Sequence, residues 1–401
     1  MKTIGIVAEY NPFHNGHAFH IAESRKRAGE DAVVIAAMSG DFVQRGEAAV
    51  YSKLARAEAA CRCGADLVVE LPVPWCIASA EGFARAAVHL LAALGADTLS
   101  FGCETEDLQE LETVAALLQR EEFIEEVRSY LTRYPDCSFA AARQAVAGQI
   151  LGRSLPCMSL PNSILALEYL KAIQRGNYHI RPDAVLRNGS SHDAAGSDVL
   201  TSAADLRSRL RSGLSIASAV PDAAEKVYAR ERMAGRELSD EKLGGLLMLS
   251  RLRFLKRADF EAVPDAGNGL GGRLYDAVQK ETDYSKVLQT ASTRRYPLAR
   301  IRRIALYAAL GVTESGFSVL PEYARVLAFT DRGRAFLHRR DDSDPALPVL
   351  IRPSSVRSVS AAAENRFQLG SAAHDFFTLH YRDTAVQRCG EDWRSGPVVC
   401  S

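Results

Sequence analysis

The sequence predicts an α/β protein in which a Rossmann-like, doubly wound parallel sheet is followed by a mainly helical domain. Through the first hundred residues, short β-branched runs alternate with amphipathic stretches in the order βαβαβαβ. The runs are apolar on both faces, as strands are when helices cover both sides of a parallel sheet. Right-handed crossovers between such strands produce the doubly wound arrangement.

The expected elements of this first part follow one another closely. Strands are expected at 3–10, 31–38, 66–71 and 97–101, and helices from about His17, at 52–63 and at 80–94. Gly64, Gly95 and Gly102 stand where a helix or strand must stop.

Beyond this region the pattern becomes more helical. Residues 104–150 have helical periodicity, a further helix is expected over 162–173, and a strand is expected near 182–187. A loop rich in Gly, Ser and Asp then leads to a helix that starts near Ser202. We place a domain boundary near Gly213, which gives domains at 1–213 and 214–401. The second domain is mostly helical until about residue 330 and mixed thereafter, and residues 388–401 look frayed.

The composition excludes several classes of protein. Of the 401 residues, 47% are hydrophobic and 24% charged, which rules out a disordered chain. Lys plus Arg and Asp plus Glu both number 49, so any polyanion partner would require local segregation of basic residues. The eight cysteines form no CxxC pair, which argues against a zinc site or a disulfide framework. There is no long apolar run, so we expect a soluble cytoplasmic protein with no membrane contact.

The clearest chemical signal is the HxGH motif of His14, Gly16 and His17, directly after the first strand. In a doubly wound sheet this position lies at the carboxyl end of a strand and at the N-terminus of a helix, which favours phosphate binding. Two imidazoles three positions apart share a helix face, so both can donate to phosphate oxygens. The first domain is therefore expected to bind a nucleotide. Alternatives are a metal site that includes His20, or histidines satisfied within the core.

The surroundings of this motif resemble a known family, the bacterial tRNA(Met) cytidine acetate ligases, which are related to the nucleotidyltransferases. The resembling segments are GIVAEYNPFHNGH, SGDFVQRGEAAVYSK, GADLVVELPVPW, LSFGCE, LPNSILALEYLKAI, SAADLR and TRRYPLARIRRIAL. The resemblance implies an ATP-dependent ligase that activates acetate as acetyl-adenylate. It also implies that the acetyl group is transferred to N4 of the wobble cytidine of elongator tRNA(Met).

The same resemblance implies a set of site residues. His14 and His17 would be catalytic and would contact the phosphates of ATP. The implied ATP-binding residues are Val7, Ala8, Glu9, Tyr10, Asn11, Pro12, Phe13, His14, Asn15, Gly16, His17, Ala18, Phe19, His20, Gly102, Asn162, Arg187 and Asn188. From the residues alone, Gly102 could instead be a strand-end turn, Asn162 a helix N-cap and Arg187 an exposed salt-bridge partner.

Three further residues are candidate phosphate contacts. Ser202 and Arg207 resemble the second phosphate-binding element of the superfamily, and Lys53 could be a mobile phosphate ligand. Without the resemblance, Ser202 and Arg207 would be an ordinary helix start and Lys53 a surface lysine. Mg²⁺ is expected to accompany ATP, and no residue is assigned as a metal ligand.

A basic stretch with no acidic residue runs from Lys286 to Arg303. With an RNA substrate implied, this stretch is the expected RNA-binding surface, although a solvated helix face would have the same composition. The residues expected to bind RNA are Arg294, Arg295, Arg300, Arg302 and Arg303.

Two other functions remain open. A metabolite nucleotidyltransferase would use the same HxGH motif, and a non-catalytic RNA-binding module could retain the fold as a relic. The GxGxxG match at 267–272 does not follow a buried strand and is discounted as a dinucleotide site. The expected partners are tRNA and acetate, and no obligate protein partner is evident.

Overall fold

The computed structural model describes residues 2–186, 202–238, 241–294, 296–340 and 347–401. Among them, eight strands form one sheet in the order β10-β8-β5-β2-β1-β6-β7, with β9 paired to β8. These strands are β1 (Thr3–Ala8), β2 (Val33–Ser39), β5 (Leu67–Leu71), β6 (Thr98–Cys103), β7 (Arg181–Leu186), β8 (Ala324–Thr330), β9 (Val349–Leu350) and β10 (Val398–Cys400). A separate hairpin is formed by β3 (Phe42–Val43) and β4 (Glu47–Ala48).

The helices of the first part are α1 (Asn15–Ala28), α2 (Lys53–Arg62), α3 (Ala80–Ala93), α4 (Leu108–Leu117), α5 (Glu121–Arg133), α6 (Phe139–Leu151), α7 (Pro161–Gly176), α8 (Ala203–Arg211) and α9 (Asp222–Met233). Those of the second part are α10 (Glu241–Arg253), α11 (Arg257–Glu261), α12 (Leu270–Lys280), α13 (Tyr284–Ala291), α14 (Leu298–Leu310), α15 (Asp331–Arg339), α16 (Ala361–Thr378) and α17 (Glu391–Arg394). None of these described helices is both long and apolar enough to cross a membrane.

The predicted doubly wound sheet is confirmed. β5, β2, β1, β6 and β7 are adjacent and parallel. Along β2, Val34 and Met38 belong to a core cluster with α1, α2 and α9, whereas Ile35 belongs to a second cluster with α3 and α7. Because successive side chains alternate between the two clusters, both faces of the sheet are buried, as the apolar runs predicted.

The sheet continues beyond the boundary predicted near Gly213. β8 pairs antiparallel with β5, and β10 and β9 pair parallel with β8. The C-terminal segment expected to be frayed is ordered instead: it forms α17 and β10, and Cys400 is buried. That expectation was wrong because a three-residue strand is too short to show a periodicity, although pairing with β8 satisfies its backbone.

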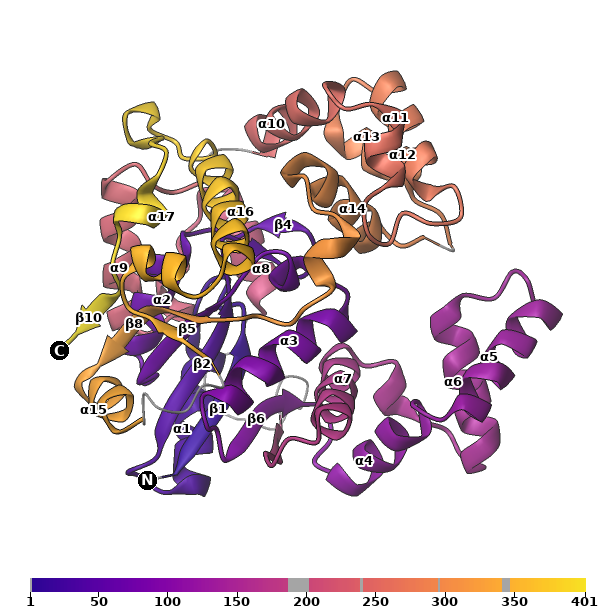
Figure 1. Cartoon of the computed structure of the whole chain (residues 1–401), viewed down its shortest axis with the longest axis horizontal. Helices are drawn as coiled ribbons and strands as arrows, with labels where there is room; N and C mark the ends of the chain where they lie inside the picture. The colour runs from indigo at the N-terminus through magenta and orange to yellow at the C-terminus, as the bar shows by residue number, and fades with distance from the viewer. Residues whose placement is uncertain (1, 187–201, 239–240, 295, 341–346) are drawn as a thin grey trace.

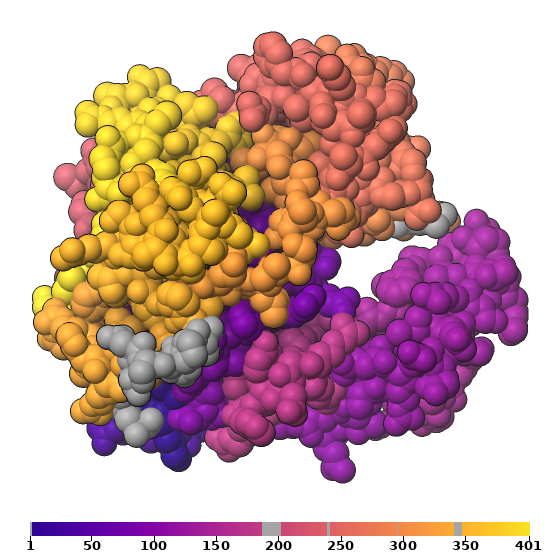
Figure 2. All heavy atoms as spheres, in the orientation of Figure 1, coloured from indigo at the N-terminus to yellow at the C-terminus, as the bar shows by residue number. Residues whose placement is uncertain are grey.

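Two groups of helices extend from the sheet on the same side of the molecule. Figure 1 shows α10–α14 above and α4–α6 below, and Figure 2 shows an open space between the two groups. The first group is the helical part expected in the second half of the chain, and α14 connects it to the sheet region through contacts with α16.

Candidate active site at the carboxyl ends of the central strands

The first strand ends where the strand order of the sheet reverses. β1 lies between β2 and β6, so the chain leaves β1 toward one side of the sheet and later returns to its other side. The register pairs Ile6 with Ser100, which places Gly102 beside the end of β1. Ligands of doubly wound sheets bind outside the carboxyl ends of the strands at such a point. The HxGH loop, residues 9–17, and Gly102 therefore meet at the carboxyl edge of the sheet, a place that we call the crevice.

The two histidines of the motif are fixed by backbone amides. His14 is the N-cap of α1 and accepts at Nδ1 from the N–H of Gly16 at 3.0 Å, and His17 accepts at Nδ1 from the N–H of His14 at 3.2 Å. The two rings stack with centroids 3.8 Å apart. A neutral imidazole that accepts at Nδ1 carries its proton on Nε2. Both rings therefore have an Nε2–H donor beside the positive end of the α1 dipole, as phosphate binding requires.

The HxGH loop is held by three residues from other segments. The N–H of Phe13 donates to the hydroxyl of Tyr228 at 2.8 Å, and the N–H of Val50 donates to Oδ1 of Asn11 at 2.8 Å. Arg207 donates from Nη1 to the carbonyl of Asn11 at 3.0 Å. α8 and α9 thus fix the loop from outside, and such preorganisation is what transition-state stabilisation needs.

The side chain of Arg56, in the protein interior, connects the carboxyl ends of β1 and β2. Its guanidinium is completely buried and donates to the carbonyls of Glu9 at 2.6 Å, Ser39 at 3.1 Å and Tyr51 at 2.9 Å, and also to that of Gly40. These carbonyls would otherwise be buried without partners, at a cost of about 1–3 kcal/mol each. The sequence reasoning missed Arg56, although a single arginine within the alanine-rich face of α2 was the available signal.

Glu9 faces the turn of the β3–β4 hairpin. Its Oε1 accepts from the N–H of Gln44 at 3.0 Å. Burial raises the pKa of Glu9, and the Gln44 amide and the positive charges of Arg207, Arg56 and Arg45 oppose this shift only in part. The hairpin turn is therefore connected directly to the residue that begins the HxGH loop.

The remaining residues implied to line ATP differ in exposure. Tyr10 and Phe13 are buried, and their ring centroids lie 5.0 Å and 5.5 Å from that of His17, so both position the His17 ring. Phe19 is exposed on α1. The others occupy the end of β1, the turn and the first turns of α1: Val7, Ala8, Pro12, Asn15 and Ala18.

His20 points to the neighbouring strand. Its Nε2 lies 3.0 Å from Oγ of Ser100, which is also 2.7 Å from Oγ of Ser24. These bonds tie α1 to β6. Within the part of the chain that the structure describes, no group of three His, Cys, Asp or Glu side chains could hold a metal ion.

Asn162 lies at the start of α7, next to the end of β6. The N-cap of α7 is Leu160, so Asn162 is not the N-cap. Its Nδ2 donates to Oε1 of Glu104 at 2.7 Å, and the N–H of Ser163 donates to Oε2 at 2.7 Å. Burial raises the pKa of Glu104, but these hydrogen bonds outweigh it and the net shift is downward. Glu104 thus caps α7 and holds Asn162 at the edge of the crevice.

Of Ser202 and Arg207, which resemble a second phosphate-binding element, only Arg207 contacts the HxGH loop. Ser202 is the N-cap of α8 and accepts from the N–H of Asp205 at 3.2 Å, which is a structural role. Arg207, one turn further, reaches the HxGH loop through Asn11. Arg187 and Asn188 lie outside the described residues.

Lys53 is buried in a cluster of charged side chains. Its Nζ lies 2.5 Å from Oδ2 of Asp392, 2.9 Å from Oε1 of Glu70 and 3.6 Å from Oδ2 of Asp41. Arg325 pairs with the same Glu70 at 3.1 Å and Asp392 at 3.0 Å. With its ammonium surrounded by carboxylates, Lys53 is not the mobile phosphate ligand that we expected, and that prediction has no support. The cluster instead joins α2, β5, β8 and α17.

His374 extends this cluster on α16. Its Nδ1 lies 2.8 Å from Oδ2 of Asp41, and its Nε2 lies 3.2 Å from Oε2 of Glu391. Burial lowers the pKa of His374, but the charge and hydrogen bond of Asp41, together with Glu391, outweigh it and raise the pKa to about 10. The imidazole is therefore protonated in the folded protein at neutral pH.

This charge predicts a pH-dependent contribution to stability. A histidine with a raised pKa stabilises the fold fully below its unfolded value of 6.5, and the contribution disappears as the pH rises toward about 10. At pH 7 the variant His374→Gln should be less stable than the wild type toward urea, and the difference should shrink steadily toward pH 10. A difference that stayed constant over this range would show that the imidazole is neutral.

The basic stretch finds acidic partners from distant segments. Arg302 pairs with Glu47 of the hairpin, and Arg303 lies 3.8 Å from Oδ2 of Asp265. Arg300 donates to the carbonyl of Asp265 at 2.7 Å, Arg294 is exposed, and Arg295 lies outside the described residues. This part of the sequence has no acidic residue of its own, but some of its cations are paired with acidic residues of other segments.

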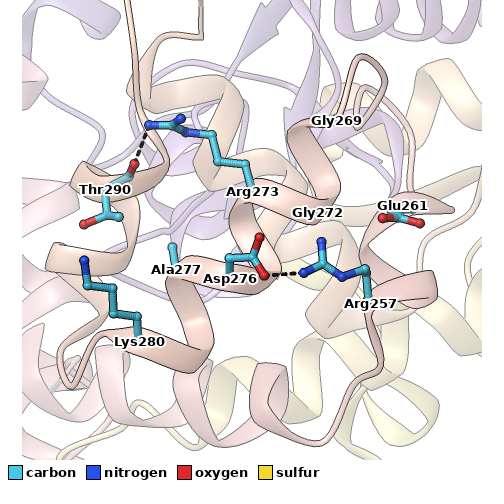
Figure 3. Close-up of a pocket in the computed structure, with 9 residues that line it drawn as sticks. All are labelled: Arg257, Glu261, Gly269, Gly272, Arg273, Asp276, Ala277, Lys280 and Thr290. Atoms are coloured by element: carbon cyan, nitrogen blue, oxygen red, sulfur yellow. Dashed lines mark hydrogen bonds and ion pairs between the residues drawn. The ribbon is translucent and has the colours of Figure 1, made fainter.

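A pocket on the helical group lies apart from this crevice. Figure 3 shows it between α11, α12 and α13, where the GxGxxG match at 267–272 begins α12. Arg257 pairs with Asp276, and Arg273 donates to the carbonyl of Thr290 at 2.8 Å, as the dashed lines show. Because these arginines are occupied, the pocket has no feature that identifies it as a nucleotide site.

Comparisons with known proteins find relatives along nearly the whole chain. The model of a family described as HIGH Nucleotidyl Transferase matches residues 1–392. A protein of Syntrophotalea carbinolica named tRNA(Met) cytidine acetate ligase is 38% identical over 84% of this chain and 82% of its own. Another of that name, from Acetivibrio thermocellus, is 30% identical over the whole of both chains.

Two crystal structures of Thermotoga maritima TmcAL are similar throughout, each at 29% identity and covering 100% of this chain and 99% of theirs. The apo form superposes with a TM-score of 0.92, and the form bound with alpha-thio ATP superposes with a TM-score of 0.90.

Proposed function

The chain belongs to the HIGH nucleotidyl transferase family, and we infer that it is an ATP-dependent ligase of the tRNA(Met) cytidine acetate ligase kind. The observation that carries this function is the pair of stacked imidazoles, each with an amide-bound Nδ1, at the N-terminus of α1. This is an ATP phosphate site by its chemistry, and a relative binds an ATP analogue on the same fold.

In the first step that we propose, an oxygen of acetate attacks the α-phosphorus of ATP. A phosphorus–oxygen bond forms to acetate, the bond to pyrophosphate breaks, and acetyl-adenylate results. Negative charge grows on the phosphate oxygens, where the Nε2–H groups of His14 and His17 can donate. Gly102 and Asn162 border the nucleotide from β6 and α7, and Arg207 adds positive charge beside the HxGH loop.

In the second step, N4 of the wobble cytidine of elongator tRNA(Met) attacks the acetyl carbonyl. The new amide forms as AMP leaves with the electrons of the anhydride bond, and the amine loses a proton. An anticodon-loop base is already single-stranded, so turning it into the site is inexpensive. Docked RNA would also exclude water from the easily hydrolysed anhydride.

Mg²⁺ is proposed to accompany ATP. No cluster of three potential metal ligands exists among the described residues, so the nucleotide phosphates and water would supply most of the ligands. The ion would neutralise negative charge on the leaving pyrophosphate.

We propose that residues 214–401 supply most of the tRNA contacts and residues 1–213 the catalytic crevice. Arg294 is exposed within the basic stretch, and Arg302 pairs with Glu47 of the hairpin. Arg300 and Arg303 are the next candidates along α14. The open space between the two helix groups provides room for RNA (Figure 2).

Incubation with ATP, labelled acetate and total tRNA, followed by nucleoside analysis, tests the function. Label should appear in N4-acetylcytidine, and the reaction should release one AMP for each nucleoside formed. A metabolite nucleotidyltransferase would leave tRNA unlabelled and transfer AMP to a small molecule. A relic RNA-binding module would consume no ATP.

A further inference from the structure

The turn of the β3–β4 hairpin lies between the HxGH loop and α14. On one side, the N–H of Gln44 binds Glu9, and Nε2 of Gln44 donates to the carbonyl of Ala78 at 3.2 Å. On the other side, Glu47 pairs with Arg302. The hairpin therefore contacts both the HxGH loop and the basic stretch.

Gly46 presses this turn against α14. A Cβ at Gly46 would lie 2.7 Å from the backbone N of Arg303 and 2.8 Å from the backbone C of Arg302. Its φ of +75° is also a conformation that favours glycine. The turn therefore has a fixed position, and the residue beside Gly46 is presented at a defined place.

That residue is Arg45, which is exposed at the tip of the turn. No hydrogen bond or ion pair joins the Arg45 guanidinium to another residue in the described ranges. Its basic neighbours are occupied: Arg207 binds the carbonyl of Asn11, Arg302 pairs with Glu47, and Arg211 lies 2.9 Å from Oε1 of Glu241. Arg45 is thus an exposed cation near Glu9, and its guanidinium can bind an anionic ligand.

The sheet order indicates which ligand this is. The residues proposed to border ATP, Gly102 and Asn162, belong to β6 and α7, on one side of β1. The hairpin follows β2, on the other side of β1. The nucleotide thus occupies the β6 side of β1 and leaves the β2 side, where Arg45 and α14 lie, to the other substrates. Acetate has no phosphate group, so the phosphate-bearing substrate on this side is the tRNA, whose N4 attacks the acetyl carbonyl.

We propose that Arg45 binds a phosphate of the tRNA strand that carries the target cytidine, and so positions the base over the crevice. The proposal rests on the proposed function, since it assigns one contact of that substrate. A planar guanidinium suits a phosphate because it donates two parallel hydrogen bonds.

The test compares Arg45→Gln with the wild type in two assays. Affinity for elongator tRNA(Met) should fall roughly 10-fold at physiological salt, as expected for the loss of one charged hydrogen bond. The salt slope, which is the slope of log affinity against log salt concentration, should become shallower by about 0.7–0.9. Acetate-dependent pyrophosphate exchange, which needs no tRNA, should stay at the wild-type rate. Arg45→Lys, which keeps the charge, should recover part of the affinity.

Lys26→Gln is the matched control, because Lys26 is an exposed cation in the last turn of α1, the end of the helix away from the HxGH loop. It should leave both assays unchanged. Unaltered tRNA affinity and salt slope in Arg45→Gln would overturn the proposal. A loss of pyrophosphate exchange would also overturn it, because Arg45 would then serve ATP. Failure of the wild type to acetylate tRNA would instead refute the proposed function itself.

Discussion

Replacing either His14 or His17 with alanine is expected to lower turnover by about 100-fold or more. Each Nε2–H is placed by a backbone amide bound to Nδ1, so it is a preorganised donor to charge that grows on phosphate. Removal of one such donor costs about 3 kcal/mol of transition-state stabilisation. ATP binding should weaken much less, because the ground state carries less of this charge. Single-turnover kinetics and a separate ATP titration measure the two effects.

The N-cap role of His14 requires a control. His14→Ala also removes the acceptor for the Gly16 amide, which costs about 0.5–2 kcal/mol of stability. His14→Asn keeps an acceptor at the N-cap, and His17→Gln can keep the reciprocal bond to the His14 amide. Both variants should retain stability yet lose turnover as the alanine variants do. Near wild-type turnover in these two variants would refute the phosphate role.

Replacing Lys53 with methionine is expected to destabilise the protein by about 3–5 kcal/mol. The substitution leaves the carboxylates of Asp392 and Glu70 buried with one cation fewer, and removal of one partner of a buried ion pair is costly. Urea unfolding at pH 7 measures the change. Because the cluster joins α17 to α2, proteolysis near the C-terminus should also become faster.

Two comparisons sharpen this result. Arg334→Gln breaks an exposed pair with Asp331 and should cost no more than about 1 kcal/mol. The double variant Lys53→Met with Asp392→Asn should be less destabilised than the sum of its single changes, since it removes one unpaired charge as well. A loss for Lys53→Met as small as that for Arg334→Gln would show that the cluster does not hold the C-terminal segment.

Local pattern predicted the parallel half of the fold well. Each of β1, β2, β5 and β6 is a short apolar run followed by a recognisable helix start or glycine, so its position follows from neighbouring residues. The location of the HxGH loop could be predicted as well, because the loop directly follows β1 and so lies at the carboxyl end of a strand in the sheet.

Contacts between distant residues could not be predicted in the same way. Lys53 follows a polar loop, and nothing near it in the sequence shows that Asp392 will lie 2.5 Å from its Nζ. The antiparallel β8 depends on pairing with β5, hundreds of residues earlier, and the short β10 depends in turn on pairing with β8. Arg302 looked unpaired because its partner Glu47 is on the hairpin. The division at Gly213 missed these connections for the same reason.

The acetate dependence of pyrophosphate exchange tests the central claim most directly. The purified chain, with ATP and labelled pyrophosphate but without tRNA, should incorporate label into ATP when acetate is present. Little incorporation should occur without acetate, because α-phosphorus then has no attacking carboxylate. His14→Asn should abolish the acetate-dependent signal. Equal exchange with and without acetate would contradict an acetyl-adenylate and with it the ligase mechanism.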